Sequence, residues 1–296
     1  MSELDKILIN AGSRKQAESF LKKPSSSVLL LGAAGSGKLN LALLLAKELL
    51  NLRSDDNLTK YAHFLHIKRD SSKRDISIDD VRRIIKLLQL KVPGTKNIRR
   101  VILVEGAQDL SIEAQNALLK ILEEPPTDSV FILTAPVETS LLPTVVSRCQ
   151  VIYLYPVTLK QTTDFYGSRY ESKEVKAAWR LSQGASALLN ALLIDDMNHP
   201  FKQAIEQVKK FLAQEKYERV ITLEEITKDK DEFRLFLDAL TRVLAVVHRV
   251  ALGNDRKVLA QKLLSDRKMI RQLISGLEVN ANSRIVNLNL LLNLKS

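Results

Sequence analysis

The sequence predicts an α/β domain with a parallel sheet, followed by an all-helical region. Short apolar runs rich in β-branched residues alternate with helical patterns in the first part of the chain. These runs are residues 28–31, 101–104, 130–133 and 151–154. Near-continuous apolar strands that alternate with helices are typical of a parallel sheet covered on both faces. After Pro156 the strand signals fade, and apolar residues recur at helical spacing, as in residues 233–252.

The length of 296 residues indicates two domains or three small ones. We predict a first domain over residues 1–157, a small helical domain over 158–207 and a second helical domain over 208–296. The change of pattern after Pro156 supports the first boundary. The second boundary rests only on the local breaker Asn198-His199-Pro200.

The chain is basic, with 45 Lys and Arg against 34 Asp and Glu, a formal net charge of +11. This favours an anionic partner such as nucleic acid, although solvated lysines alone explain the same charge. The single cysteine, Cys149, excludes an intramolecular disulfide framework and a cysteine-rich zinc site, and it fits a reducing compartment. No apolar run approaches the roughly 20 residues that span a bilayer, and the N-terminus lacks a signal-peptide pattern. We therefore expect a cytoplasmic protein with no membrane partner.

The first apolar run leads into a phosphate-binding loop pattern, Gly-Ala-Ala-Gly-Ser-Gly-Lys, at residues 32–38. The glycines let backbone N–H groups turn toward phosphate oxygens, and the following helix N-terminus adds a partial positive charge. The candidate nucleotide-binding residues of this loop are Gly32, Gly35, Ser36, Gly37 and Lys38.

The next position departs from the pattern. A working loop has Ser or Thr there, whose hydroxyl binds Mg²⁺, whereas this chain has Leu39. The second half of such a site is an apolar strand that ends in acidic residues, and residues 101–104 are followed by Glu105 and Gly106. Glu105 could bind residual Mg²⁺ or simply accept hydrogen bonds from nearby backbone N–H groups. Gly106 has no side chain to activate water, so efficient hydrolysis at this site is not expected.

Two further motifs follow along the chain. Residues 116–126 read Asn-Ala-Leu-Leu-Lys-Ile-Leu-Glu-Glu-Pro-Pro, and residues 147–149 read Ser-Arg-Cys. Together with the apolar run between them, they resemble the AAA+ subunits of the bacterial DNA polymerase III clamp loader, the gamma/tau and delta-prime family. The resemblance implies an AAA+ domain over residues 1–157, a lid domain over 158–207 and an oligomerising collar domain over 208–296.

Within this family, gamma/tau is the motor, and delta-prime typically has a degenerate nucleotide site. Leu39 and Gly106 fit the delta-prime pattern. The motor also has a phosphate-sensing arginine in its lid, and residues 185–193 contain none. Ala135-Pro136 stands where the motor has threonines. The resemblance therefore implies a non-hydrolysing stator within the DNA polymerase III holoenzyme, part of the bacterial replisome at the nucleoid. Two alternatives stay open, an active gamma/tau-like ATPase with unusual motifs and a free-standing basic DNA-binding protein.

In this family the Ser-Arg-Cys arginine acts on a neighbouring subunit. The resemblance thus implies that Arg148 reaches the γ-phosphate of ATP held by an adjacent motor subunit. The alternative is an ion pair between Arg148 and an acid of its own chain. We read Glu123 and Glu124 as a solvated helix end before the prolines, with no chemical role.

The resemblance implies that no cofactor is required, and it allows weakly bound ATP or ADP at the degenerate loop. Many members of the family have a four-cysteine zinc module, which this chain lacks. His63 and His66 fall in an apparent strand with no third ligand nearby, so we predict no zinc.

The expected partners are the gamma/tau and delta subunits, primer–template DNA and, indirectly, the sliding clamp. Basic side chains cluster between the apparent strand that holds His66 and the apolar run at residues 101–104. Arg82, Arg83 and Lys86 on a predicted helix are the candidate DNA-binding residues, by phosphate contacts without sequence preference. The cluster also contains Lys68, Arg69, Lys73, Arg74, Lys96, Arg99 and Arg100. A solvated amphipathic helix explains the same pattern.

Overall fold

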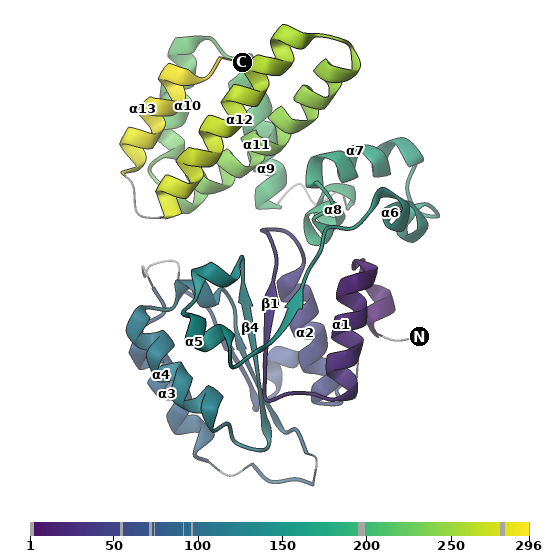
Figure 1. Cartoon of the computed structure of the whole chain (residues 1–296), viewed down its shortest axis with the longest axis vertical. Coiled ribbons are helices and arrows are strands. Elements are labelled where there is room, and N and C mark those ends of the chain that lie inside the picture. Colours follow the sequence, from purple (N-terminus) through teal and green to yellow (C-terminus); the bar gives the residue numbers. More distant parts are fainter. Residues whose placement is uncertain are drawn as a thin grey trace. The chain divides into compact units, whose positions relative to one another are not determined.

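The structure is a computed structural model of the whole chain (Figure 1). It describes residues 3–53, 56–70, 73, 75–90, 92–95, 97–194, 199–278 and 282–295. Internal contacts divide the chain into two compact units. The first unit is Met1–Phe165 with Gly184–Ala187, and the second is Tyr166–Gln183 with Leu188–Ser296. The breaker residue Asn198 lies outside the described residues, and the division into three domains stays a prediction.

The first unit contains a five-stranded parallel sheet in the order β2-β3-β4-β1-β5. The strands are β1 Ser27–Leu31, β2 Phe64–Ile67, β3 Arg100–Val104, β4 Ser129–Ala135 and β5 Gln150–Tyr153. The four predicted apolar runs lie within β1, β3, β4 and β5 or overlap them, and the apparent strand around His66 is β2. The predicted parallel α/β architecture is confirmed.

Helices cover both faces of this sheet, with α1 and α2 on one side and α3, α4 and α5 on the other (Figure 1). Side chains of β1 alternate between two cores: Val28 and Leu30 enter one, and Leu29 and Leu31 enter the other. Burial on both faces explains why the strands read as continuous apolar runs rather than as an alternating pattern.

Local signals set the ends of the helices in this unit. A capping box between Ser77 and Asp80 begins α3, and α4 ends at Glu123 shortly before Pro125 and Pro126. The helices of this unit are α1 Ala11–Lys22, α2 Lys38–Leu49, α3 Ile78–Leu88, α4 Ile112–Glu123 and α5 Pro143–Val146. Short 3-10 helices are η1 Glu3–Lys6, η2 Leu58–Lys60, η3 Ala107–Asp109 and η4 Glu138–Ser140.

The described residues after β5 form helices, in agreement with the fading of strand signals in the sequence. These are α6 Leu159–Tyr166, α7 Ser172–Ser182, α8 Ser186–Leu193, α9 Pro200–Ala213, α10 Lys216–Ile226, α11 Lys230–Gly253, α12 Lys257–Glu278 and α13 Ser283–Asn293. Phe211 and Phe236 pack edge to face in the core of the second unit, with ring centroids 5.3 Å apart. Arg242 is buried on α11 and donates to the Ser182 carbonyl at the end of α7. Among the described helices, none combines the length and apolar character needed to cross a bilayer.

Candidate nucleotide site and interface arginine

The glycine-rich loop follows β1 and leads into α2, as the motif predicts. Lys38 is the first residue of α2, and its ammonium folds back onto the loop. Its Nζ donates to the carbonyl oxygen of Gly32 at 2.5 Å and to that of Ala33 at 3.0 Å. Burial lowers the pKa of Lys38 to about 8. The loop thus holds its lysine on its own backbone, within the region where phosphates would bind.

Residues 184–187 bind the same loop from a distant part of the sequence. The backbone N–H of Ala187 donates to the Gly35 carbonyl at 3.0 Å, and Ser186 Oγ donates to the Ser36 carbonyl at 2.9 Å. Gly37 has φ +91°, and a Cβ there would lie 3.0 Å from Ser186 Oγ. Sequence reasoning examined this segment only for an arginine, and it missed these contacts because they join residues 150 positions apart.

Leu39 is partly buried and packs against the protein core. Its side chain packs against the apolar cluster between α2 and the sheet, which includes Leu41 and Leu45. Side chains in such a cluster exclude water and provide no oxygen ligand. The residue at the usual Mg²⁺-binding position therefore stabilises the fold instead.

Glu105 stands just beyond β3 and pairs with a histidine. His66 Nε2 and Glu105 Oε2 are 2.9 Å apart, across the β2–β3 pair. The hydrogen bond from His66 holds the pKa of Glu105 below its ordinary value, against the opposing effect of partial burial. From the sequence, Glu105 could bind Mg²⁺ or accept hydrogen bonds from backbone N–H groups. In the structure its partner is instead the side chain of His66 on the edge strand β2.

Gly106 differs from a catalytic glutamate in backbone as well as in side chain. Its φ of +70° lies in the left-handed region, and its N–H donates to Thr134 Oγ1 at 2.9 Å. A Cβ at this position would meet Asp109 Oδ2 at 2.9 Å. L-residues in this conformation cost roughly 1–2 kcal/mol. A glutamate at this position would therefore require a strained backbone.

We expect Gly106→Glu to lower the stability of the first unit by roughly 1–2 kcal/mol and to add no ATP turnover. The reason is that the left-handed backbone at Gly106 strains a glutamate and directs its side chain against Asp109. Chemical denaturation followed by circular dichroism measures the first effect, and a phosphate-release assay measures the second. Turnover gained by this single change would contradict the interpretation.

Lys38 should make stability depend on pH in the alkaline range. The unfolded chain keeps the Lys38 proton up to a pKa of 10.5, whereas the folded chain releases it at about 8. Between these values unfolding takes up a proton, so the free energy of unfolding rises with pH. From pH 8 to pH 10.5, we expect the free energy of unfolding of the wild type to rise by roughly 3 kcal/mol relative to that of Lys38→Met. Equal slopes in denaturation series of the two proteins would contradict this.

Arg148 lies at the opposite end of the sheet from the loop. The Arg148 carbonyl accepts a hydrogen bond of 2.6 Å from Ser27 Oγ, so it is level with the start of β1, whereas the loop begins after the end of β1 at Gly32. Five residues of parallel strand separate the two points by about 16 Å. The guanidinium donates from NH1 to the Thr144 carbonyl at 2.9 Å and from NH2 to Glu123 Oε1. The intrachain ion pair that the sequence left open is therefore present.

Cys149 follows Arg148 and packs against the core on the α4 face of the sheet. Burial raises the pKa of its thiol to about 11, against a smaller opposing effect of the Ser27 hydroxyl. A thiol with this pKa is protonated at neutral pH and has little nucleophilic character.

Comparison with known proteins finds matches to DNA polymerase III subunits. Residues 14–158 match the family described as DNA polymerase III, delta subunit. DNA polymerase III subunit delta' of Haemophilus influenzae is 30% identical over 201 residues, which are 64% of this chain and 59% of that protein. The same subunit of Bacillus subtilis is 24% identical over 82% of this chain and 78% of its own length. The chain is similar to the delta-prime subunits of DNA polymerase III.

The matched part of this chain spans about three fifths of the length of the Haemophilus protein. Its fold is similar to that of a DNA polymerase III gamma subunit-related protein from Thermotoga maritima, at 21% identity and a TM-score of 0.55. The match covers 95% of this chain and 97% of that one. The branch-migration motor RuvB of the same organism matches at a TM-score of 0.50 over 89% of this chain and 84% of its own. These likenesses show an AAA+ type of fold, with a parallel-sheet domain followed by helices.

The candidate DNA-binding residues lie on the exposed face of α3. Arg82 pairs with Asp79 at 3.4 Å and Arg83 with Asp80 at 4.0 Å, and Lys86 is exposed. The opposite face of α3 is buried in the core, through Val81, Ile84 and Leu88. Both sequence interpretations of this helix, an amphipathic element and a phosphate-binding surface, are compatible with this arrangement.

The other basic residues of this region are in different environments. Arg100 is only 6% exposed and is bound to Asp128, so it does not present its charge at the surface. Arg99 also pairs with Asp128, at 3.0 Å. Arg74 and Lys96 lie outside the described residues. Arg100 is therefore removed from the set of candidate DNA contacts because it is buried.

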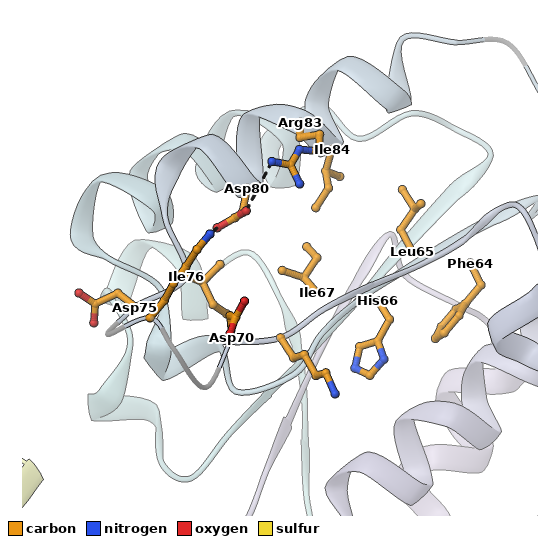
Figure 2. Close-up of a pocket in the computed structure, with 12 residues that line it drawn as sticks. Phe64, Leu65, His66, Ile67, Asp70, Asp75, Ile76, Asp80, Arg83 and Ile84 are labelled. Carbon is orange, nitrogen blue, oxygen red and sulfur yellow. Dashed lines mark ion pairs between the residues drawn. The ribbon is translucent and has the colours of Figure 1, made fainter. Parts of the chain in front are cut away.

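A pocket of about 430 Å³ lies between β2 and α3 (Figure 2). Its lining includes the basic residues Lys68 and Lys73, and Figure 2 shows Arg83 directed toward Asp80 and the histidine ring of His66 on the strand side. Asp70 and Asp75 also line it, so the pocket has mixed charge rather than a purely basic lining. Among the described residues, no three of the His, Cys, Asp and Glu side chains are grouped so that they could hold a metal ion. The absence of zinc stays a prediction.

Proposed function

We propose that this chain is a delta-prime clamp-loader subunit that does not hydrolyse ATP and that supplies Arg148 to ATP on a neighbouring motor subunit. Similarity to DNA polymerase III delta' subunits supports the clamp-loader part of this proposal. The position of Arg148 supports the finer part.

The observation that carries the proposal is the separation of Arg148 from the loop of its own chain. About 16 Å of parallel strand lies between the level of Arg148 and Gly32, and an arginine side chain is too short to cover that distance. Arg148 is nevertheless 33% exposed, at the junction between α5 and the edge strand β5. An arginine in this position serves a phosphate of another molecule rather than one bound to its own loop.

The chain's own site supports the absence of hydrolysis. Leu39 packs against the core, Gly106 has a left-handed backbone, and Glu105 is bound to His66. Lys38 is bound to the Gly32 and Ala33 carbonyl oxygens of its own loop. Any ATP or ADP must draw the Lys38 ammonium away from these oxygens before it can bind a phosphate, which favours weak binding at most.

The helical unit is the proposed site of assembly with gamma/tau and delta subunits. On α13, the exposed side chains Ile285, Leu288 and Leu292 recur at helical spacing, as expected for a helix face that a partner covers. The lid over 158–207 and the collar over 208–296 belong to this proposal. The assembled complex would act on primer–template DNA and place the sliding clamp on it.

Reconstitution with gamma/tau and delta subunits tests this function. We expect the isolated chain to show no Mg²⁺-dependent ATP turnover above blank, and to join a complex whose turnover rises with primed DNA and clamp. Turnover by the isolated chain that Lys38→Ala abolishes would instead identify a gamma/tau-like ATPase. Salt-sensitive DNA binding without any assembly would support a free-standing DNA-binding protein.

A further inference from the structure

The contacts of Arg148 indicate a role for a residue that the sequence left without one. Glu123 is the last residue of α4, and its Oε1 accepts from Arg148 NH2. Arg148 NH1 donates to the Thr144 carbonyl, four residues earlier in the chain. One terminal nitrogen is thus bound to a fixed backbone oxygen and the other to a carboxylate. Two points of attachment determine the plane of the guanidinium and not only its location.

The place of Glu123 in α4 explains why it pairs with a cation. A helix C-terminus has a partial negative charge, so a carboxylate there is locally unfavourable. Glu124 follows directly and adds a second negative charge. The Arg148 guanidinium offsets this repulsion, while the prolines after Glu124 keep the helix from extending. The carboxylate is thereby held at the end of a packed helix rather than on a loop.

The backbone of Arg148 is fixed as well. Its carbonyl accepts from Ser27 Oγ at the start of β1, and its N–H donates to the Val145 carbonyl at 3.2 Å. A guanidinium has five N–H donors, and the two contacts to Thr144 and Glu123 use one from each terminal nitrogen. The remaining three N–H groups include that of Nε, and the side chain is one third exposed. These donors are available to an external anion while the two intrachain contacts stay in place.

We propose that Glu123 is a positioning residue for Arg148, which holds the guanidinium in one orientation so that its remaining donors face the phosphate of a neighbouring subunit. The inference rests on the proposed function, because it concerns the same arginine. A free arginine side chain loses rotamer freedom when it meets a phosphate, and the pair with Glu123 removes part of that freedom before the phosphate arrives. The ion pair is exposed and therefore weak, which limits the effect to a severalfold change in rate.

Glu123→Gln in the reconstituted complex tests the inference, with Glu124→Gln as the matched control. Both changes remove one negative charge from the end of α4, but only Glu123 contacts Arg148 among the interactions of the described residues. We expect Glu123→Gln to lower the rate constant of DNA-stimulated hydrolysis about two- to fivefold with little change in the KM for ATP. Glu124→Gln should match wild type. The slow residual phase of an Arg148→Ala complex should be the same with and without Glu123→Gln.

The outcomes separate the inference from the function on which it rests. If Arg148→Ala leaves hydrolysis unchanged, the proposed function fails. If Arg148→Ala lowers hydrolysis while Glu123→Gln equals Glu124→Gln, only the positioning role fails. A faster rate in Glu123→Gln would mean that Glu123 competes with the phosphate, which also overturns positioning. A further loss from Glu123→Gln in the Arg148→Ala complex would mean that Glu123 acts through another group, with the same consequence.

Discussion

Arg148→Ala is expected to remove fast hydrolysis of the one ATP that faces this chain in the assembled clamp loader. A guanidinium that neutralises charge on the transferring phosphoryl group contributes about 10³–10⁵ in rate in well-studied nucleotide hydrolases. The proposal concerns only the ATP that faces Arg148, so in a complex with further ATP sites the fast phase of a single-turnover experiment should lose amplitude rather than disappear. Quenched-flow measurement with primed DNA and clamp resolves this amplitude.

Arg148→Lys is the matched variant for this experiment. Lysine keeps the positive charge but lacks the planar fork that binds Thr144, Glu123 and a phosphate together. We expect an intermediate rate at the affected site, and unchanged assembly for both variants in size-exclusion chromatography. A fast phase of full amplitude with Arg148→Ala would leave Arg148 as the structural partner of Glu123 alone.

Asp128→Ala is expected to lower the stability of the first unit by about 3–5 kcal/mol, because it leaves a buried cation without its partner. Asp128 and Arg100 are each only 6% exposed, and Arg100 NH2 donates to Asp128 Oδ1 at 2.7 Å. Arg100 also donates to the Leu88 and Leu90 carbonyls at the end of α3, at 3.0 Å each. The network therefore joins the start of β3 to the end of α3 and to the residue before β4.

Denaturant unfolding followed by circular dichroism checks this value. Fluorescence is unsuitable for the first unit, because the single tryptophan, Trp179, is in the second. The double variant Arg100→Met with Asp128→Leu should recover much of the loss, since apolar replacements remove both buried charges. A loss below about 1 kcal/mol for Asp128→Ala would indicate that water or another acid compensates Arg100.

The same carboxylate makes stability depend on acid pH. Burial opposes ionisation of Asp128, but hydrogen bonds from Arg100 and Arg99 outweigh it and hold its pKa below the ordinary 3.8. The ionised carboxylate therefore contributes fully to the free energy of unfolding above the pKa that Asp128 has in the unfolded chain, and this contribution is lost as pH falls through the lower pKa of the folded chain. The free energy of unfolding of Asp128→Asn should lack this dependence on acid pH.

The sequence by itself determined the parallel-sheet architecture and the main parts of the site. Continuous apolar runs marked four strands because both faces of the sheet are buried, and the glycine-rich loop was visible because its residues are adjacent in the chain. Leu39 and Gly106 were recognised as departures because each occupies a defined place in a short motif.

The tertiary structure alone decided which of these residues meet. The pairs Glu123–Arg148, His66–Glu105 and Arg100–Asp128 join residues 25, 39 and 28 positions apart. Such pairs depend on the register of parallel strands and on where each crossover helix ends, which local sequence patterns do not encode. The left-handed backbone at Gly106 and the burial of Arg100 likewise depend on how distant segments pack. Motifs record which chemical groups a chain carries, whereas the packing of distant segments sets their partners, their exposure and their pKa values.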